Sequence, residues 1–245
     1  MKKLLLHLGK LVKLLAKRKV VFIIVEGPSD QDALGLLLSK IFDPNKVVMH
    51  VMYGDITSRN GVIPENIREC IAKEVKRYAN QYRLKSSDFQ EIIHIIDMDG
   101  TYISDDYVLE DEKLNKTIYS LDFIKTYDSQ AIINRNLNKR KNVNKLHETP
   151  VIWGIPYSAY YMSCNLDHVL YNKLNSTDEE KENDSHQFAR QYRSNIDEFK
   201  KYMTESNFSI IGEYLDTWKF IKKDKHSLER YTNLGVRLLK EKKQI

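Results

Sequence analysis

Acidic residues follow three apolar runs of the sequence at the points where those runs end. They are Glu26 after residues 20–25, Asp55 after 47–52, and the pair Asp97 and Asp99 after 92–96. Residues two apart in an extended segment point the same way, so Asp97 and Asp99 are expected to present both carboxylates to one place. Like charges this close raise each other's pKa unless a cation neutralises them. The pattern therefore predicts an open site for a hard divalent ion, Mg²⁺ or Mn²⁺.

The apolar runs that precede these acids have the composition of buried strands. The run 20–25 is continuous and rich in β-branched residues, as expected of a strand covered on both faces. Helical stretches over about 29–41 and 64–82 separate the runs, and a fourth strand is predicted over 151–155. This alternation predicts an α/β fold with a mostly parallel, four-stranded sheet flanked by helices. Ligands of such sheets lie at the carboxyl ends of the strands, where the acids are.

The two ends of the chain differ from this alternating region. Residues 1–18 form a basic amphipathic pattern, interpreted as an N-terminal helix that packs on its own core, on a partner subunit or on a membrane surface. Residues 19–160 are assigned to the α/β domain and residues 161–245 to a helical C-terminal extension. Within that extension, helices are predicted over about 165–174, 186–203 and 227–242, and an acidic, solvated loop over 178–184.

Composition narrows the class of protein further. The chain has 245 residues, a net charge of +5 and two cysteines, Cys70 and Cys164, too few for a four-ligand zinc site. The low cysteine content favours a reducing, cytoplasmic setting, and no uninterrupted apolar segment approaches the ~20 residues that cross a bilayer, so a soluble protein is expected. Much of the positive charge falls within residues 125–145, where six basic side chains accompany one acid. Beside a metal site, Arg135, Lys139, Arg140, Lys141 and Lys145 would hold phosphates, although such a stretch is also typical of a solvated helix face.

Two motifs in this order resemble a TOPRIM domain. They are the strand ending in Glu26-Gly27-Pro28-Ser29-Asp30 and the strand ending in Asp97-Met98-Asp99-Gly100. The TOPRIM fold is shared by topoisomerases, bacterial primases, small ribonucleases and overcoming-lysogenization-defect (OLD-like) nucleases. The match covers about residues 19–100 and, more loosely, extends to 155. The resemblance implies a Rossmann-like sheet and a Mg²⁺-dependent site for phosphodiesters, with Glu26 as acid/base or ligand and with Asp97 and Asp99 holding metal.

Within that family the chain is most similar to stand-alone defence nucleases. It lacks the cysteines of primase zinc modules, has no room for a topoisomerase arch, and contains no phosphate-binding loop of an ATPase. The resemblance therefore implies an endonuclease that cuts DNA or RNA in bacterial antiphage defence, with a separate ATPase as a candidate partner. A second copy of the chain is another candidate partner, since the sequence does not fix the oligomeric state. The resemblance also implies that Asp30 and Asp167 complete the metal ligands.

Other interpretations stay open on the sequence alone. Asp97-Met98-Asp99-Gly100-Thr101 also resembles the haloacid dehalogenase phosphatase motif, although that motif normally follows the first strand. A non-catalytic module that binds nucleic acid or a partner protein is a further alternative. Individual acids have structural interpretations as well: Asp30 and Asp167 as helix caps, and Asp55 as a turn residue. His94 lies within an apolar run and is expected to be a hydrogen-bonded core residue.

Overall fold

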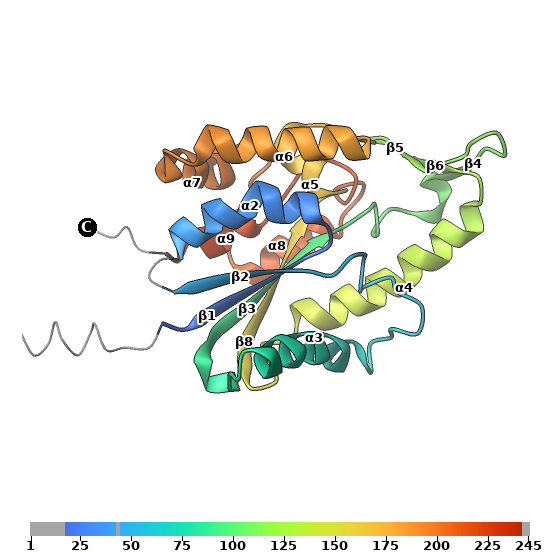
Figure 1. Cartoon of the computed structure of the whole chain (residues 1–245). Coiled ribbons are helices and arrows are strands. Elements are labelled where there is room, and N and C mark those ends of the chain that lie inside the picture. The colour runs from blue at the N-terminus through green and yellow to red at the C-terminus, as the bar shows by residue number, and fades with distance from the viewer. Residues whose placement is uncertain (1–17, 43–44, 242–245) are drawn as a thin grey trace, which may run out of the picture.

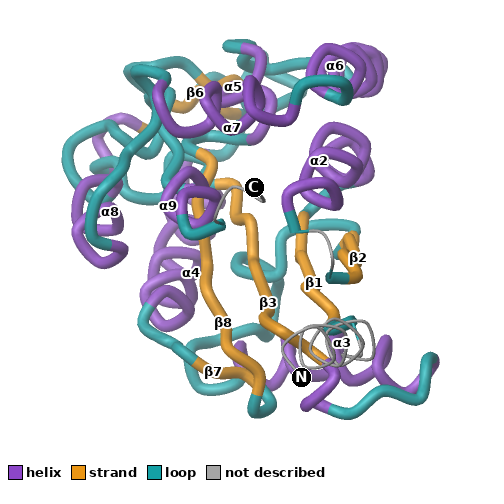
Figure 2. The backbone as a smooth tube through the Cα atoms, turned by 90° about the vertical axis from the view of Figure 1, so that its left-hand side faces the viewer, coloured by secondary structure: helices purple, strands orange, loops and turns teal. Residues whose placement is uncertain are grey.

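A five-stranded sheet forms the core of the part of the chain that the computed structural model describes, residues 18–42 and 45–241. The strand order is β2-β1-β3-β8-β7 (Figure 2). The strands are β1 (Val20–Val25), β2 (Lys46–Val51), β3 (Phe89–Asp97), β7 (Val151–Ile152) and β8 (Ile155–Met162). All neighbours pair in parallel except β7, which pairs antiparallel with β8. The expected α/β fold with a mostly parallel sheet is confirmed, but the predicted number of four strands is wrong, because the short antiparallel strand β7 adds a fifth.

Helices cover both faces of the sheet (Figure 1). One face carries α2 (Pro28–Ile41), α5 (Leu166–Tyr171), α6 (Asp178–Tyr192), α7 (Ile196–Glu205) and α9 (Leu234–Leu239), and the other carries α3 (Ile67–Gln81), α4 (Ser129–His147) and α8 (Tyr214–Ile221). Side chains of β1 alternate between the two: Phe22 and Ile24 pack toward α3, and Ile23 and Val25 pack toward α2. The fully apolar run 20–25 follows from this double coverage.

A small second sheet lies beside α4 at one end of the molecule (Figure 1). It consists of β4 (Val108–Glu110), β6 (Ile124–Thr126) and β5 (Ile118–Tyr119), in the order β4-β6-β5. Short 3-10 turns, η1 (Ser86–Asp88) and η2 (Asp105–Tyr107), precede β3 and β4. A separate apolar cluster of Ile103, Val108, Ile124 and Leu228 holds the small sheet in place. The sequence patterns gave no indication of it, because its strands are only two or three residues long.

The predicted fourth strand is displaced in the structure. Residues 151–152 form the short antiparallel strand β7, and Trp153 and Gly154 turn the chain with φ angles of 51° and 73°. The long parallel strand is β8, which begins at Ile155 and includes Pro156. The prediction of a strand over 151–155 is wrong because Trp153 and Gly154 form a tight turn inside an apolar run.

The helical part of the chain differs from its prediction in four places. The single helix predicted over 186–203 is interrupted, since α6 ends at Tyr192 and Asn195 caps a new helix, α7. The acidic segment 178–184 is not a loop but the first half of α6, because Thr177 and Glu180 form a capping box and acids suit a helix N-terminus. The helix predicted over 227–242 is reduced to α9, and α8 has no predicted counterpart. The apolar clusters on the two faces of the main sheet both contain residues from either side of position 160, where the predicted α/β domain ends.

The basic N-terminal helix predicted over residues 1–18 lies, apart from Arg18, outside the described residues. Among the helices that the structure does describe, none combines the length and the apolar character needed to cross a membrane.

Candidate active site

Glu26 and Asp97 meet at the carboxyl edge of the sheet, where β1 and β3 end. These strands are adjacent and parallel, with Ile24 opposite His94. The backbone N–H of Asp97 donates a hydrogen bond to Oε1 of Glu26 at 3.2 Å, although the two residues are 71 positions apart. Both residues are partly buried. The structure therefore brings together two acids that the sequence pattern predicts in one site.

Asp99 occupies a tightly held turn directly after β3. Its backbone is left-handed, with a φ of 47°. Its N–H donates to the carbonyl of Cys164 at 2.7 Å, and Arg135 donates to its carbonyl at 2.9 Å. Gly100 follows with a φ of 69°, and a Cβ there would lie 2.7 Å from a methyl group of Leu228. The backbone turn that carries the Asp99 carboxylate is thus fixed from several sides.

Lys139 is the cation at the centre of this acidic group. It lies on α4, its side chain has no exposed surface, and its Nζ is 2.9 Å from Oδ2 of Asp55 and 2.7 Å from Oδ2 of Asp99. Burial disfavours its charge, but Asp55 and Asp99 outweigh burial and raise the pKa of Lys139 well above its ordinary value. Burial also raises the pKa of Asp55, yet Lys139 and hydrogen bonds from Ser58 and Thr57 hold it well below normal. Asp55 and Lys139 therefore form a stable ion pair.

Glu26 and Asp97 lack comparable neutralisation. Burial raises the pKa of Glu26 well above its ordinary value; Lys139 lowers it, while Asp55 and Asp99 raise it further. Burial likewise raises the pKa of Asp97, and Glu26 and Asp30 add to this effect. Lys139 is the cation that lowers the pKa of both acids, and it already contacts Asp55 and Asp99, while the guanidinium of Arg135 lies beside Asp99. The site thus favours additional positive charge near Glu26 and Asp97.

Asp30 and Asp167 form a second acidic pair next to the first. Oδ2 of Asp30 accepts a hydrogen bond from Gly27 N–H at 2.9 Å, so the Asp30 carboxylate helps to cap the N-terminus of α2, in line with its interpretation as a helix cap. Burial and the neighbouring Asp167 raise the pKa of Asp30 to about 6, against the opposing Gly27 hydrogen bond. Asp167 is not a helix cap, since Asn165 caps α5. Oδ2 of Asp167 lies 4.0 Å from Nζ of Lys181.

The donor chemistry of the site suits a hard divalent ion, but its ligands are not pre-assembled. Within the described ranges, no three His, Cys, Asp or Glu side chains are grouped as a ready metal site. Asp99 is turned toward Lys139, which leaves Glu26 and Asp97 as the available oxygen ligands. Mg²⁺ is usually held by one or two carboxylates together with waters and substrate phosphates. Glu26 and Asp97 therefore fit such an ion, and Asp99 would join them if its side chain left Lys139.

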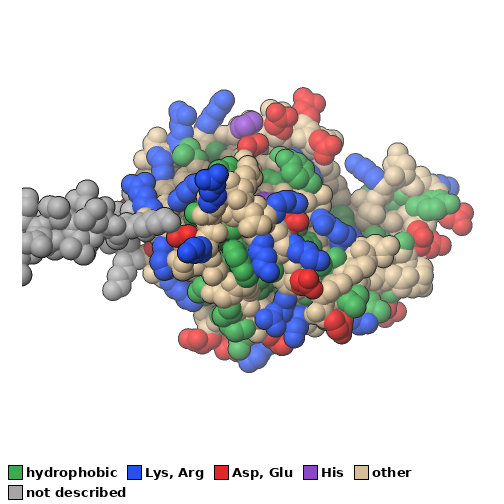
Figure 3. Space-filling model, turned by 60° about the horizontal axis from the view of Figure 1, so that its bottom comes forward, with side chains coloured by type: hydrophobic (Ala, Val, Ile, Leu, Met, Phe, Trp, Pro, Cys, Tyr) green, Lys and Arg blue, Asp and Glu red, His purple; other side chains and the backbone are tan. Residues whose placement is uncertain are grey.

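The five basic residues predicted to hold phosphates fall into two groups: three are bonded to other groups of the fold, and two are exposed. Lys139 has no exposed side-chain surface, which contradicts its predicted contact with phosphate. Arg135 donates to Asp99 O and to Tyr119 Oη at 2.7 Å, and Arg140 donates to Thr101 O at 3.0 Å. Lys141 and Lys145 alone of the five are exposed. On the face that carries α3, Figure 3 shows basic side chains spread out with acidic ones between them.

The inward position of Lys139 had a signal in the sequence. Lys139, Val143 and Leu146 recur at helical spacing, and all three are fully buried on one face of α4.

The predicted core role of His94 is confirmed: it is 1% exposed, and its Nδ1 lies 2.9 Å from Tyr157 Oη.

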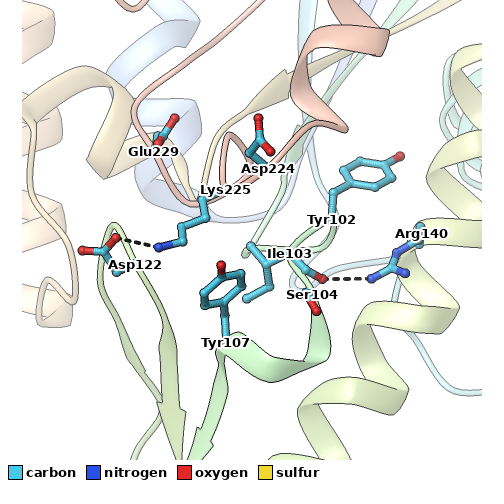
Figure 4. A pocket seen from close by; sticks show the side chains of 9 residues that line it. All are labelled: Tyr102, Ile103, Ser104, Tyr107, Asp122, Arg140, Asp224, Lys225 and Glu229. Carbon is cyan, nitrogen blue, oxygen red and sulfur yellow. Dashed lines mark hydrogen bonds and ion pairs between the residues drawn. The ribbon is translucent and has the colours of Figure 1, made fainter.

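A cavity of about 700 Å³ lies beside Arg140, next to the turn that follows Gly100 (Figure 4). Its lining residues are Tyr102, Ile103, Ser104, Tyr107, Asp122, Arg140, Asp224, Lys225 and Glu229. Both cations in this lining are engaged: Arg140 donates to the carbonyl of Ile103, and Nζ of Lys225 lies 2.8 Å from Asp122. Neither Glu26 nor Asp97 lines the cavity, so it is separate from the candidate active site.

Comparison of the chain with protein-family models, with curated proteins and with solved structures finds no match. The TOPRIM resemblance accordingly rests on the order and spacing of the Glu26 and Asp97 motifs themselves.

Proposed function

We propose that this protein is a divalent-cation-dependent nuclease that hydrolyses phosphodiester bonds of DNA or RNA on a TOPRIM-like scaffold. The observation that carries the proposal is the meeting of Glu26 and Asp97 at the carboxyl edge of the sheet, with raised pKa values and insufficient positive charge around them. The resemblance to stand-alone TOPRIM nucleases extends the proposal to antiphage defence with a separate ATPase.

The residues of the chain have distinct roles in this proposal. Glu26 and Asp97 would hold the ion, which when bound would activate water and stabilise charge on the phosphate. Lys139 keeps the Asp55 and Asp99 carboxylates in place and supplies positive charge close to the reacting group. Arg135 fixes the Asp99 turn through its carbonyl and thereby acts as a positioning residue.

The test is cleavage of labelled single-stranded and duplex DNA and RNA in Mg²⁺ or Mn²⁺. We expect Glu26→Gln and Asp97→Asn each to lower cleavage by at least about 100-fold, because losing metal-based stabilisation costs several kcal/mol. Glu179→Gln, an exposed acid of α6, is the matched control and should leave cleavage unchanged. Equal cleavage by all four proteins would contradict the proposal. Hydrolysis of a generic aryl phosphate that needs Asp97 but not Glu26 would favour the phosphatase alternative.

A second candidate function has its own support. Lys139 already contacts Asp55 and Asp99, and no three-residue ligand group stands ready within the described part of the chain. A non-catalytic module that binds nucleic acid or a partner protein is consistent with a site closed by an internal cation. Tight binding of nucleic acid without cleavage in either metal would support this module over the nuclease.

A further inference from the structure

Tyr53 is an exposed aromatic residue at the carboxyl ends of the strands, where the candidate active site also lies. It lies just after β2, and 81% of its surface is exposed. Its backbone is left-handed, with a φ of 51°, a conformation that costs a bulky residue free energy. The next residue, Gly54, donates its N–H to the carbonyl of Glu26 at 3.1 Å. The ring of Tyr53 is thus presented to solvent one residue away from a direct contact with the site.

The loop that carries Tyr53 is anchored rather than loose. Thr57 donates its N–H to Oδ1 of Asp55 at 2.7 Å, and Asp55 is also paired with Lys139. Asn142 of α4 donates to the carbonyls of Thr57 and Val62 at 2.8 and 2.9 Å. The exposure of Tyr53 is therefore a property of a fixed loop.

A cavity of about 520 Å³ lies beside Tyr53 along the outer edge of β2. This volume falls within the range of about 300–1,000 Å³ that is typical of small-ligand sites. Arg59 also lines the cavity, and its side chain makes no hydrogen bond or ion pair with the residues that the structure describes. Arg77 adds a second guanidinium, and its partner Glu74 lines the cavity as well, so Arg59 is the cation of the lining that is left for an anion. An exposed ring and a guanidinium without a partner among the described residues, both in one hollow, suit a group that is both aromatic and anionic, such as a nucleotide.

We propose that Tyr53 is a stacking platform for an unpaired base, and that Arg59 contacts a phosphate beside that base. The proposal deepens the proposed nuclease function and rests on it: it makes the substrate a single-stranded segment of nucleic acid. Bases in a duplex are already stacked on both faces, whereas an unpaired base has a free face for an aromatic side chain. Such stacking tolerates any base, so little sequence preference is expected.

Affinity measurements in the Glu26→Gln background test this proposal without cleavage of the probe. Fluorescence anisotropy with labelled single-stranded DNA and RNA oligonucleotides and their duplexes gives the dissociation constants at low salt. We expect single strands to bind more tightly than duplexes, and Tyr53→Ala and Tyr53→Leu to weaken single-strand binding by about 5-fold to 150-fold. Tyr53→Trp should retain it, because tryptophan also stacks. Tyr127→Ala, at a 61% exposed tyrosine outside this cavity, is the matched control.

Two results would overturn the platform: duplex bound as tightly as single strand, or Tyr53→Ala binding like its parent. A cleavage assay on the protein with intact Glu26 shows whether the stacking platform or the proposed nuclease function has failed. Cleavage with an affinity that does not depend on Tyr53 overturns the platform and leaves the nuclease in place. Single-strand binding that depends on Tyr53, without cleavage in either metal, supports the platform and overturns the nuclease.

Discussion

At the scale of single residues, Lys139 determines the charge balance of the site. Replacing it with methionine leaves the partly buried Asp55 and Asp99 without their partner, and breaking an ion pair that has a fully buried member typically costs up to about 3–5 kcal/mol. We expect Lys139→Met to lose a comparable free energy of unfolding in urea titrations. Lys141→Met, at an exposed position of the same helix, should stay within about 0.5 kcal/mol of the parent. A Lys139→Met protein as stable as the parent would contradict the central role of this cation.

His94 makes a pH-dependent contribution that can be measured separately. Burial lowers its pKa from 6.5 to about 4. Between these values the unfolded chain binds the proton more tightly, so His94 lowers the free energy of unfolding as the pH falls from about 6.5 to 4. Glutamine can keep a hydrogen bond to Tyr157 but does not titrate. Between pH 7.5 and 4.5 the free energy of unfolding should fall by about 2–3 kcal/mol more in the parent than in His94→Gln. Parallel pH profiles of this free energy in the two proteins would show that His94 does not titrate in this way.

At the scale of elements, α4 links the small sheet, the Asp99 turn and the loop that holds Asp55. Asn142 is buried and donates to two carbonyls of that loop. We expect Asn142→Ala to cost about 1–3 kcal/mol, because it removes the side-chain donor from the buried carbonyl of Thr57 and leaves the carbonyl of Val62 with Asn138 at 3.3 Å. Hydrogen exchange should then rise across residues 55–66. Asn134→Ala, at an exposed position of α4, is the control. Equal exchange in both variants would mean that α4 does not hold the loop.

The elements around the acids were predictable because their patterns are local. The β-branched run 20–25 and the apolar spacing of α2 predicted β1 and α2 and thereby the position of Glu26. The pairing of Lys139 with Asp55 and Asp99 was not predicted, because it depends on how α4 packs across the sheet. The turn at Trp153 and Gly154 was missed because it interrupts an apolar run without a polar residue.

At the scale of the whole molecule, the C-terminal part of the chain completes the core. Trp218 is fully buried in the cluster that contains Phe22, and Asn233 accepts a hydrogen bond from Tyr161 N–H of β8 at 2.9 Å. We therefore expect one cooperative urea transition. The chain has two tryptophans, so Trp153→Phe makes the fluorescence report Trp218 alone. The urea transition followed by Trp218 fluorescence should coincide with the transition followed by far-UV circular dichroism. Separate transitions would instead support an independently folding C-terminal extension.

The central claim, that Glu26 and Asp97 hold a divalent ion, is tested most directly by calorimetric titration of Mn²⁺ into the protein. We predict binding that weakens by at least about 10-fold in Glu26→Gln and in Asp97→Asn, since even groups that only support metal ligands contribute this much to affinity. The Glu179→Gln control should bind like the parent. No Mn²⁺ binding at millimolar concentration, or binding that neither site variant changes, would contradict the claim.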